Sequence, residues 1–329
     1  MSVSFIHVGM IKTASTYLQS VWLKDEQYAL AFSGAGKVVQ YIRQSTLRGD
    51  FDANYPMNIE LDKQPIADNN VIISSEGFSA AYLTAIEERP VRTMMGNAAE
   101  ILGTLNKETD NVLICVRSPV AWMKSVHAQF INEGQYGNWD RFFAYKEQFL
   151  KDALDLEYML SCYEKFFNNV VVMPFEYLKQ DEPGFWEALS SHFDVPRPKV
   201  QVEVQNESLK GARLRLLSSL NRVSYVLRSG LSESCVSDGQ EIDFLIKNDA
   251  NYSKWVHRRF CQYASEESLL EACNLLGVQS EDASFNSVSI TREMADWVED
   301  KFIKSIEKRV SDQDLIENYR AELLKAVID

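Results

Sequence analysis

SFIHVGMIKTASTYLQ, residues 4–19, joins a short apolar run to a helix-compatible run through a loop that holds one lysine. The run SFIHV has the length and nearly continuous apolarity of a strand that is buried on both faces of a sheet. After Gly9, Lys12 precedes a set of small, mostly hydroxylic residues: Thr13, Ala14, Ser15 and Thr16. The layout predicts a strand, a turn and a helix that directs its first N–H groups back toward the strand end.

Three similar apolar runs follow along the chain: NVIISS (70–75), NVLICV (111–116) and NVVVMP (169–174). Between them, residues 91–106 and 151–167 carry apolar side chains at helical steps of three and four. Strands that alternate with helices indicate the α/β class, with a parallel β-sheet flanked by helices. Residues 31–69 lack clear periodicity, which suggests an insertion near the sheet edge.

The character of the sequence changes near residue 211. From there the patterns are mostly helical, with no further buried strand, and residues 281–329 read as a solvated helical cover. We therefore expect an α/β core over 1–210 and a mainly helical C-terminal extension, 211–329, packed on that core.

Composition and charge restrict the class of protein. The chain has 329 residues, of which 46% are hydrophobic and 25% charged, as in a soluble globular protein. Its formal net charge of −13 argues against a broad binding surface for nucleic acid or for an anionic membrane. Five scattered cysteines without zinc spacing predict no metal site, and the absence of a basic leader or a long apolar run predicts a cytoplasmic protein without a membrane span.

The Lys12 loop has the layout of an anion cradle. In a parallel sheet, ligands gather at the carboxyl ends of the strands, where free helix N–H groups and the helix dipole favour an anion. Lys12 adds a full charge, and three hydroxyl groups add donors. Only two residues separate Gly9 from Lys12, so this loop is shorter than the G-x-x-x-x-G-K-[ST] loop that wraps a triphosphate. An ordinary strand–turn–helix with an exposed lysine is the alternative.

The run VLICVRSPVAWMKSVHAQF suggests a second anion site. Its strand ends at Arg117, with Ser118 as the expected N-cap and Pro119 in the first helical turn. Ser125 follows Arg117 by eight residues, about two helical turns along. A cation thus stands where nucleoside triphosphatases place a carboxylate for magnesium, which favours an anion site that needs no metal.

Together these motifs resemble the sulfotransferases that use 3′-phosphoadenosine 5′-phosphosulfate (PAPS), nearest to the bacterial-type, carbohydrate-directed branch. KTAST at 12–16 resembles the family's 5′-phosphosulfate loop, and Arg117 with Ser125 resembles its 3′-phosphate motif. PFEYLKQDEPGFWEALSSHF, residues 174–193, resembles a later family stretch. The three motifs span about the first 200 residues in the family's order. Ile11 replaces the family's usual proline and Ala14 its usual glycine, so the loop requires that φ of Ala14 stay negative.

The resemblance implies a role for each matching residue. Lys12 would hold the bridging oxygen and stabilise charge as the sulfuryl group leaves. The N–H and hydroxyl groups of the loop would hold the 5′-phosphate, from Thr13, Ala14, Ser15 and Thr16. Arg117 and Ser125 would bind the 3′-phosphate, and Lys210, in a late loop NESLKG that also contains Asn206 and Ser208, would touch the same group.

Two residues compete for the role of catalytic base. Glu76, at the exit of the strand NVIISS, resembles the catalytic carboxylate of the carbohydrate-directed branch, although it could instead cap the next helix. His127 lies two residues beyond Ser125, so it should point away from a ligand that Ser125 faces. Glu176 is expected to be a buried, hydrogen-bonded carboxylate, and Tyr136 and Trp139 could line an acceptor pocket.

Three functions follow from these residues. The first is a PAPS-dependent sulfotransferase that acts on a hydroxyl or amine of a carbohydrate, glycolipid or small metabolite. The second is a magnesium-dependent small-molecule or nucleotide kinase with an atypical phosphate loop. The third is a non-catalytic nucleotide-binding or scaffolding protein. The sequence leaves the acceptor and the oligomeric state open.

Overall fold

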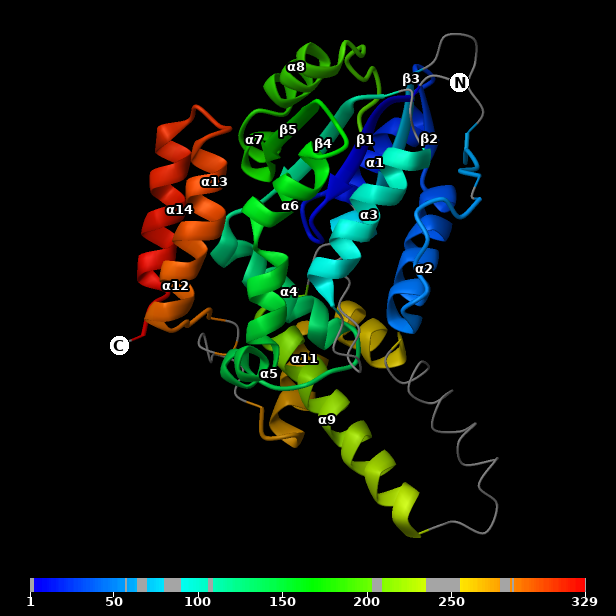
Figure 1. Cartoon of the computed structure of the whole chain (residues 1–329). Helices are drawn as coiled ribbons and strands as arrows, with labels where there is room; N and C mark the ends of the chain where they lie inside the picture. The colour runs from blue at the N-terminus through cyan, green and yellow to red at the C-terminus, as the bar shows by residue number, and fades with distance from the viewer. Residues whose placement is uncertain are drawn as a thin grey trace.

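The structure is a computed structural model of the chain, shown in Figure 1. It describes residues 3–56, 58–63, 70–79, 90–105, 109–202, 209–234, 255–278, 285 and 287–328. Among these residues, no helix is both long enough and apolar enough to cross a membrane.

A parallel sheet of five strands lies at the centre. The strands are β1 (Val3–Gly9), β2 (Tyr28–Ala31), β3 (Asn70–Ser75), β4 (Asn111–Val116) and β5 (Asn169–Pro174), in the spatial order β2-β3-β1-β4-β5. Four of them confirm the predicted apolar runs, and the α/β class is confirmed with them. The edge strand β2, with the sequence YALA, was not predicted.

Helices cover both faces of the sheet (Figure 1). One face packs against α1 (Ser15–Lys24) and α8 (Glu182–Phe193), where Trp22 and Phe193 contact the ring of Phe5 from β1. The other face packs against α2 (Ser33–Arg48), α3 (Val91–Leu105), α4 (Pro119–Asn132) and α6 (Leu156–Glu164). Burial on both faces explains why the strand sequences are apolar throughout.

The expectation for residues 31–69 was wrong in one respect. Residues Ser33–Arg48 form the regular helix α2, which packs on β3 and α3 rather than forming an irregular insertion. Its buried side recurs at helical spacing, with Val38 and Ile42 beside the small residues Gly34, Ala35 and Ser45, and the small residues made this pattern easy to overlook. A Cβ on Gly34 would lie 2.4 Å from the Glu60 carbonyl oxygen, which explains the glycine at that contact. Residues 64–69 lie outside the described residues.

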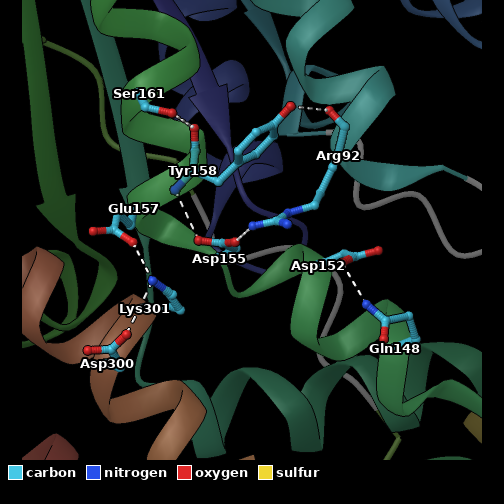
Figure 2. Close-up of polar contacts among 9 residues, drawn as sticks. All are labelled: Arg92, Gln148, Asp152, Asp155, Glu157, Tyr158, Ser161, Asp300 and Lys301. Carbon is cyan, nitrogen blue, oxygen red and sulfur yellow. Dashed lines mark hydrogen bonds and ion pairs between the residues drawn. The ribbon is translucent and has the colours of Figure 1, made fainter.

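The helical pattern at 151–167 divides into two helices. The first, α5 (Trp139–Ala153), ends just before Asp155, whose carboxylate accepts the Tyr158 backbone N–H at 3.0 Å and caps α6. Arg92 of α3 forms an ion pair with Asp155 and lies 4.6 Å from the centre of the Tyr158 ring. Figure 2 shows these contacts, which hold the segment between α5 and α6 against α3.

The C-terminal region is more deeply packed than its composition suggests. It contains α12 (Arg292–Val298), the π-helix η3 (Glu299–Ile303), α13 (Lys304–Glu307) and α14 (Gln313–Lys325). Phe302, Ile306 and Ile316 are fully buried in the main core, so the expectation of a solvated cover was wrong. Lys301 binds Glu157 of α6 at 2.7 Å, as Figure 2 shows.

A second group of C-terminal helices packs at the carboxyl ends of the strands. Helix α9 (Gly211–Ser234), residues 255–263 and α11 (Glu266–Leu275) form a small apolar cluster with α4. Leu217 and Cys261 of this group are buried against Ala128 and Ile131 of α4. The far end of α9 extends away from the sheet (Figure 1). Two short elements complete the list, α7 (Phe175–Gln180) and the 3₁₀ helix η1 (Glu76–Ser79).

Candidate active site

Three neighbouring strands bring the predicted site residues to one edge of the sheet. Strand β1 lies between β3 and β4, with Val8 paired to Ser75 and Gly9 paired to Cys115. The residues that follow these strand ends include Lys12, Glu76 and Arg117. The order of strands therefore places a base candidate and two cations side by side at the ligand-binding edge of an α/β sheet.

Close packing fixes the path of the loop after β1. A Cβ on Gly9 would lie 2.2 Å from Ser15 Oγ, so any other residue would displace the start of α1. The Met10 N–H donates to the Cys115 carbonyl at 3.2 Å, and Trp122 Nε1 donates to the Ile11 carbonyl at 2.9 Å. Strand β4 and helix α4 thus hold both residues that precede Lys12.

The backbone of the loop contradicts one expectation. Lys12 and Ala14 both have positive φ, +66° and +64°, in the left-handed region. The requirement that Ala14 keep a negative φ was therefore wrong. For a residue with a Cβ this conformation costs about 1–2 kcal/mol, and the hydrogen bonds that hold the loop offset that cost.

The N-terminus of α1 offers free N–H groups to an anion. Ala14 is the N-cap residue and its methyl group cannot accept a hydrogen bond, so no side chain at the N-cap satisfies the first N–H groups of the helix. Ser15 is buried and Thr16 is exposed at the mouth of the loop. The Thr13 hydroxyl donates to the Met10 carbonyl at 2.5 Å, which leaves the Thr13 backbone N–H, rather than its hydroxyl proton, for a ligand.

Arg117 connects the two predicted anion sites. Its Nη1 atom donates to Ser125 Oγ and to the Lys12 carbonyl oxygen, both at 3.2 Å. Ser118 is the N-cap of α4 and Pro119 its first residue, as predicted. The structure therefore brings Arg117 and Ser125 together and joins them to the Lys12 loop.

Lys12 and Glu76 interact electrostatically. Burial lowers the pKa of the Lys12 ammonium, Glu76 opposes that shift, and Arg258 and Arg117 add to it. Burial raises the pKa of the Glu76 carboxyl, while the Ser15 hydroxyl, the Lys12 ammonium and the Lys12 backbone N–H lower it. A carboxyl with a raised pKa beside a lysine is a common arrangement in sites that move protons.

Glu76 does not cap the helix that it begins. The Ser75 side chain accepts the Gly77 N–H at 3.1 Å, and the Glu76 carbonyl accepts the Ser79 hydroxyl at 2.8 Å. The alternative in which the Glu76 carboxylate is a helix cap therefore has no support in η1. Its side chain instead faces the Lys12 loop.

The rival base is part of the core. His127 is fully buried, its Nε2 atom lies 3.2 Å from the Gly137 carbonyl oxygen, and its ring packs against Trp139 and Phe142. Trp139 is itself buried and donates from Nε1 to the Ser289 carbonyl, so the expectation that it lines an acceptor pocket was wrong. Tyr136 is half-buried and lies under the Arg141 guanidinium at 4.2 Å.

Two residues that act on Lys12 were not predicted. Lys12 Nζ donates to Gln129 Oε1 at 3.4 Å, and Gln129 lies one helical turn beyond Ser125, a spacing that could have indicated it. Arg258, from the distant segment 255–263, acts electrostatically on Lys12. Lys210 is exposed just before α9. Asn206 and Ser208 of its loop lie outside the described residues.

Comparison with protein-family models and with curated protein sequences finds no match to this chain.

Proposed function

We propose that the chain is a PAPS-dependent sulfotransferase whose acceptor is a hydroxyl or amine of a carbohydrate, glycolipid or small metabolite. One observation carries the proposal: Arg117 hydrogen-bonds both Ser125 and the carbonyl of Lys12. Two cation-bearing anion sites on adjacent strand ends suit a nucleotide with separate 5′ and 3′ charged groups. PAPS would supply an activated sulfuryl group, and the uncapped helix N-terminus fits its 5′ end.

The residues at the 5′ end have complementary tasks. Lys12 and the free N–H groups of α1 would bind negative charge, and the Lys12 ammonium would stabilise the charge that develops on the leaving oxygen. The hydrogen bond that Lys12 donates to Gln129 Oε1 and the Arg117 contact with the Lys12 carbonyl restrain that lysine. Most of the catalytic effect would come from positioning and electrostatics, as in loose phosphoryl transfer.

Glu76 is the proposed general base. It follows β3, beside the Lys12 loop, and burial raises its pKa. A raised pKa makes the carboxylate a stronger base toward an acceptor hydroxyl or ammonium. His127, buried among aromatic rings, has no comparable position.

A magnesium-dependent kinase is the second candidate, because one observation favours it. Glu76 directly follows β3, the strand next to β1, so it offers a carboxylate that could hold a metal ion beside the Lys12 loop. Two observations oppose a kinase. The interval from Gly9 to Lys12 is shorter than in a triphosphate-binding loop, and the cation Arg117 lies on the other side of β1.

The direct test is sulfuryl transfer. Purified protein is incubated with labelled PAPS and a panel of sugars, glycolipids, phenols and amines, with a chelator present, and labelled products are counted. The proposal expects transfer to at least one acceptor, and the Lys12→Ala variant is the control. Phosphate transfer from ATP with magnesium, without sulfate transfer on the same panel, would establish the kinase instead.

A further inference from the structure

The C-terminal helix α14 supplies two residues, Tyr319 and Glu322, that contact neighbours of Arg117. Tyr319 is buried and donates its hydroxyl to Glu176 Oε2 at 2.5 Å. Glu322, one turn along the helix, accepts the Ser118 hydroxyl. Ser118 directly follows Arg117, so a residue 204 positions away from it in the sequence reaches the proposed 3′-phosphate site.

Neutral donors occupy both oxygens of Glu176. The Ser118 backbone N–H donates to Oε1 at 3.1 Å, and the Tyr319 hydroxyl occupies Oε2. Glu176 and Glu322 both act electrostatically on the Arg117 guanidinium. Among the ion pairs of the described residues, however, neither carboxylate lies within 4.0 Å of a guanidinium nitrogen of Arg117.

This arrangement is unusual for an arginine near two acids. A carboxylate close to a guanidinium normally forms a two-pronged ion pair, which would occupy the N–H groups that a phosphate needs. Here Arg117 directs Nη1 to Ser125 and to the Lys12 carbonyl, and its guanidinium carbon lies 5.3 Å from the centre of the Phe175 ring. The two acids accept hydrogen bonds from Ser118 and Tyr319 instead.

We propose that Tyr319 is a positioning residue that holds Glu176 away from Arg117 and so keeps the guanidinium available to the phosphate of a ligand. The inference rests on the proposed function, because it takes Arg117 as the 3′-phosphate ligand. Without the Tyr319 hydroxyl, Oε2 of Glu176 loses its donor, and Arg117 is the nearby cation that satisfies it. The carboxylate then competes with the phosphate for the same N–H groups.

A purely structural role predicts something different. If the Tyr319 hydroxyl only anchors α14, its removal lowers the melting temperature and leaves ligand preference unchanged. The useful readout is therefore a ratio of two affinities, for adenosine 3′,5′-bisphosphate and for adenosine 5′-monophosphate, which differ by the 3′-phosphate alone. A general loss of stability does not move this ratio.

The experiment measures that ratio calorimetrically in the wild-type chain and in five variants, of which Arg117→Ala tests the ligand assignment itself. Tyr319→Phe is expected to lower it roughly tenfold, the size of one charge-assisted hydrogen bond. Adding Glu176→Gln to that variant restores the ratio, because an amide does not compete as an anion. Glu176→Gln alone leaves the ratio at or above wild type. Tyr28→Phe, which removes another buried tyrosine hydroxyl from its bond to the Pro196 carbonyl, is the matched control and leaves the ratio unchanged.

Each outcome decides between the two claims. An unchanged ratio in Tyr319→Phe, or no recovery in the double variant, overturns the positioning role. In that case, a ratio near one in Arg117→Ala would still support Arg117 as the 3′-phosphate ligand, on which the proposed function depends. Failure of the wild-type protein to distinguish the two nucleotides overturns both. If Tyr319→Phe does not fold, a lower ratio in Glu176→Gln alone contradicts the inference, because removal of a competing anion cannot weaken phosphate binding.

Discussion

Nη1 of Arg117 lies 3.2 Å from Oγ of Ser125, and the same atom lies 3.2 Å from the carbonyl oxygen of Lys12. One guanidinium thus ties the start of α4 to the loop that precedes α1. This contact places the two expected anion-binding segments in a single site, and the first predictions test its parts.

Arg117→Ala should weaken binding of adenosine 3′,5′-bisphosphate by about 10–100-fold, because charge-assisted hydrogen bonds each contribute about 1.5–3 kcal/mol. Ser125→Ala should have a smaller effect in the same direction. Affinity for adenosine 5′-monophosphate should change little in either variant. Calorimetric titration measures all three, and an unchanged bisphosphate affinity in Arg117→Ala would refute the assignment.

Lys12→Ala should reduce the transfer rate by about 10²–10³-fold, the usual effect of removing one group that stabilises developing charge. The variant should fold normally, because the hydrogen bond that the ammonium donates to Gln129 Oε1 is long, at 3.4 Å. Single-turnover rates and thermal unfolding are the measurements. A variant that retains wild-type turnover would show that the lysine is not part of the reaction.

Glu76→Gln should slow transfer while nucleotide affinity stays nearly unaltered. In the wild-type protein, burial raises the pKa of Glu76, and a base must be deprotonated to act. The acidic limb of the pH–rate profile should therefore lie above the ordinary carboxyl pKa of 4.5. Ser15 lowers this pKa, so Ser15→Ala should move the limb to still higher pH. A limb that stays in place in Ser15→Ala, or full activity in Glu76→Gln, argues against Glu76 as the base.

Ala14→Gly should stabilise the fold by about 0.5–1 kcal/mol, because glycine adopts the left-handed conformation of this residue without steric strain. The matched control is Ala321→Gly, at an exposed position inside α14, which should destabilise by about 1 kcal/mol. Urea unfolding compares the two. Equal destabilisation by both changes would contradict the left-handed backbone at Ala14.

His7 should make the fold sensitive to acid. Burial lowers its pKa from 6.5 to about 3, so only the unfolded chain binds a proton as the pH falls below 6.5. Its contribution to stability is complete above pH 6.5 and is lost progressively toward pH 3. Between pH 7 and pH 5, wild type should lose about 2 kcal/mol more than His7→Gln. Parallel pH profiles for the two proteins would contradict the buried, neutral state of His7.

The sequence predicted most of the sheet, and the failures have physical causes. Four strands are rich in valine and isoleucine and are buried on both faces, which gives a strong signal. Strand β2 is four residues long with two alanines, and three of the five buried residues of α2 are glycine, alanine and serine, so the helical spacing of that buried side was overlooked. The region after residue 281 has many acidic residues on its outer side. These residues led to the expectation of a solvated cover, although the apolar residues of the inner face are fully buried.

The site was predictable where its parts follow strand ends. Lys12, Glu76 and Arg117 each come directly after an apolar run, so the parallel sheet alone brings them together. The left-handed conformation at Ala14 was not predictable, because it results from contacts made by the whole loop. Tyr319 and Arg258 approach from the C-terminal region, and no spacing in the sequence indicates such long-range contacts.

The most direct test of the central claim is calorimetric titration of the full chain with adenosine 3′,5′-bisphosphate in the presence of a chelator. The account predicts tight, metal-independent binding at one site per chain, which weakens when either Lys12 or Arg117 is replaced by alanine. Binding that requires magnesium, or binding of ATP with magnesium in preference to the bisphosphate, would contradict it.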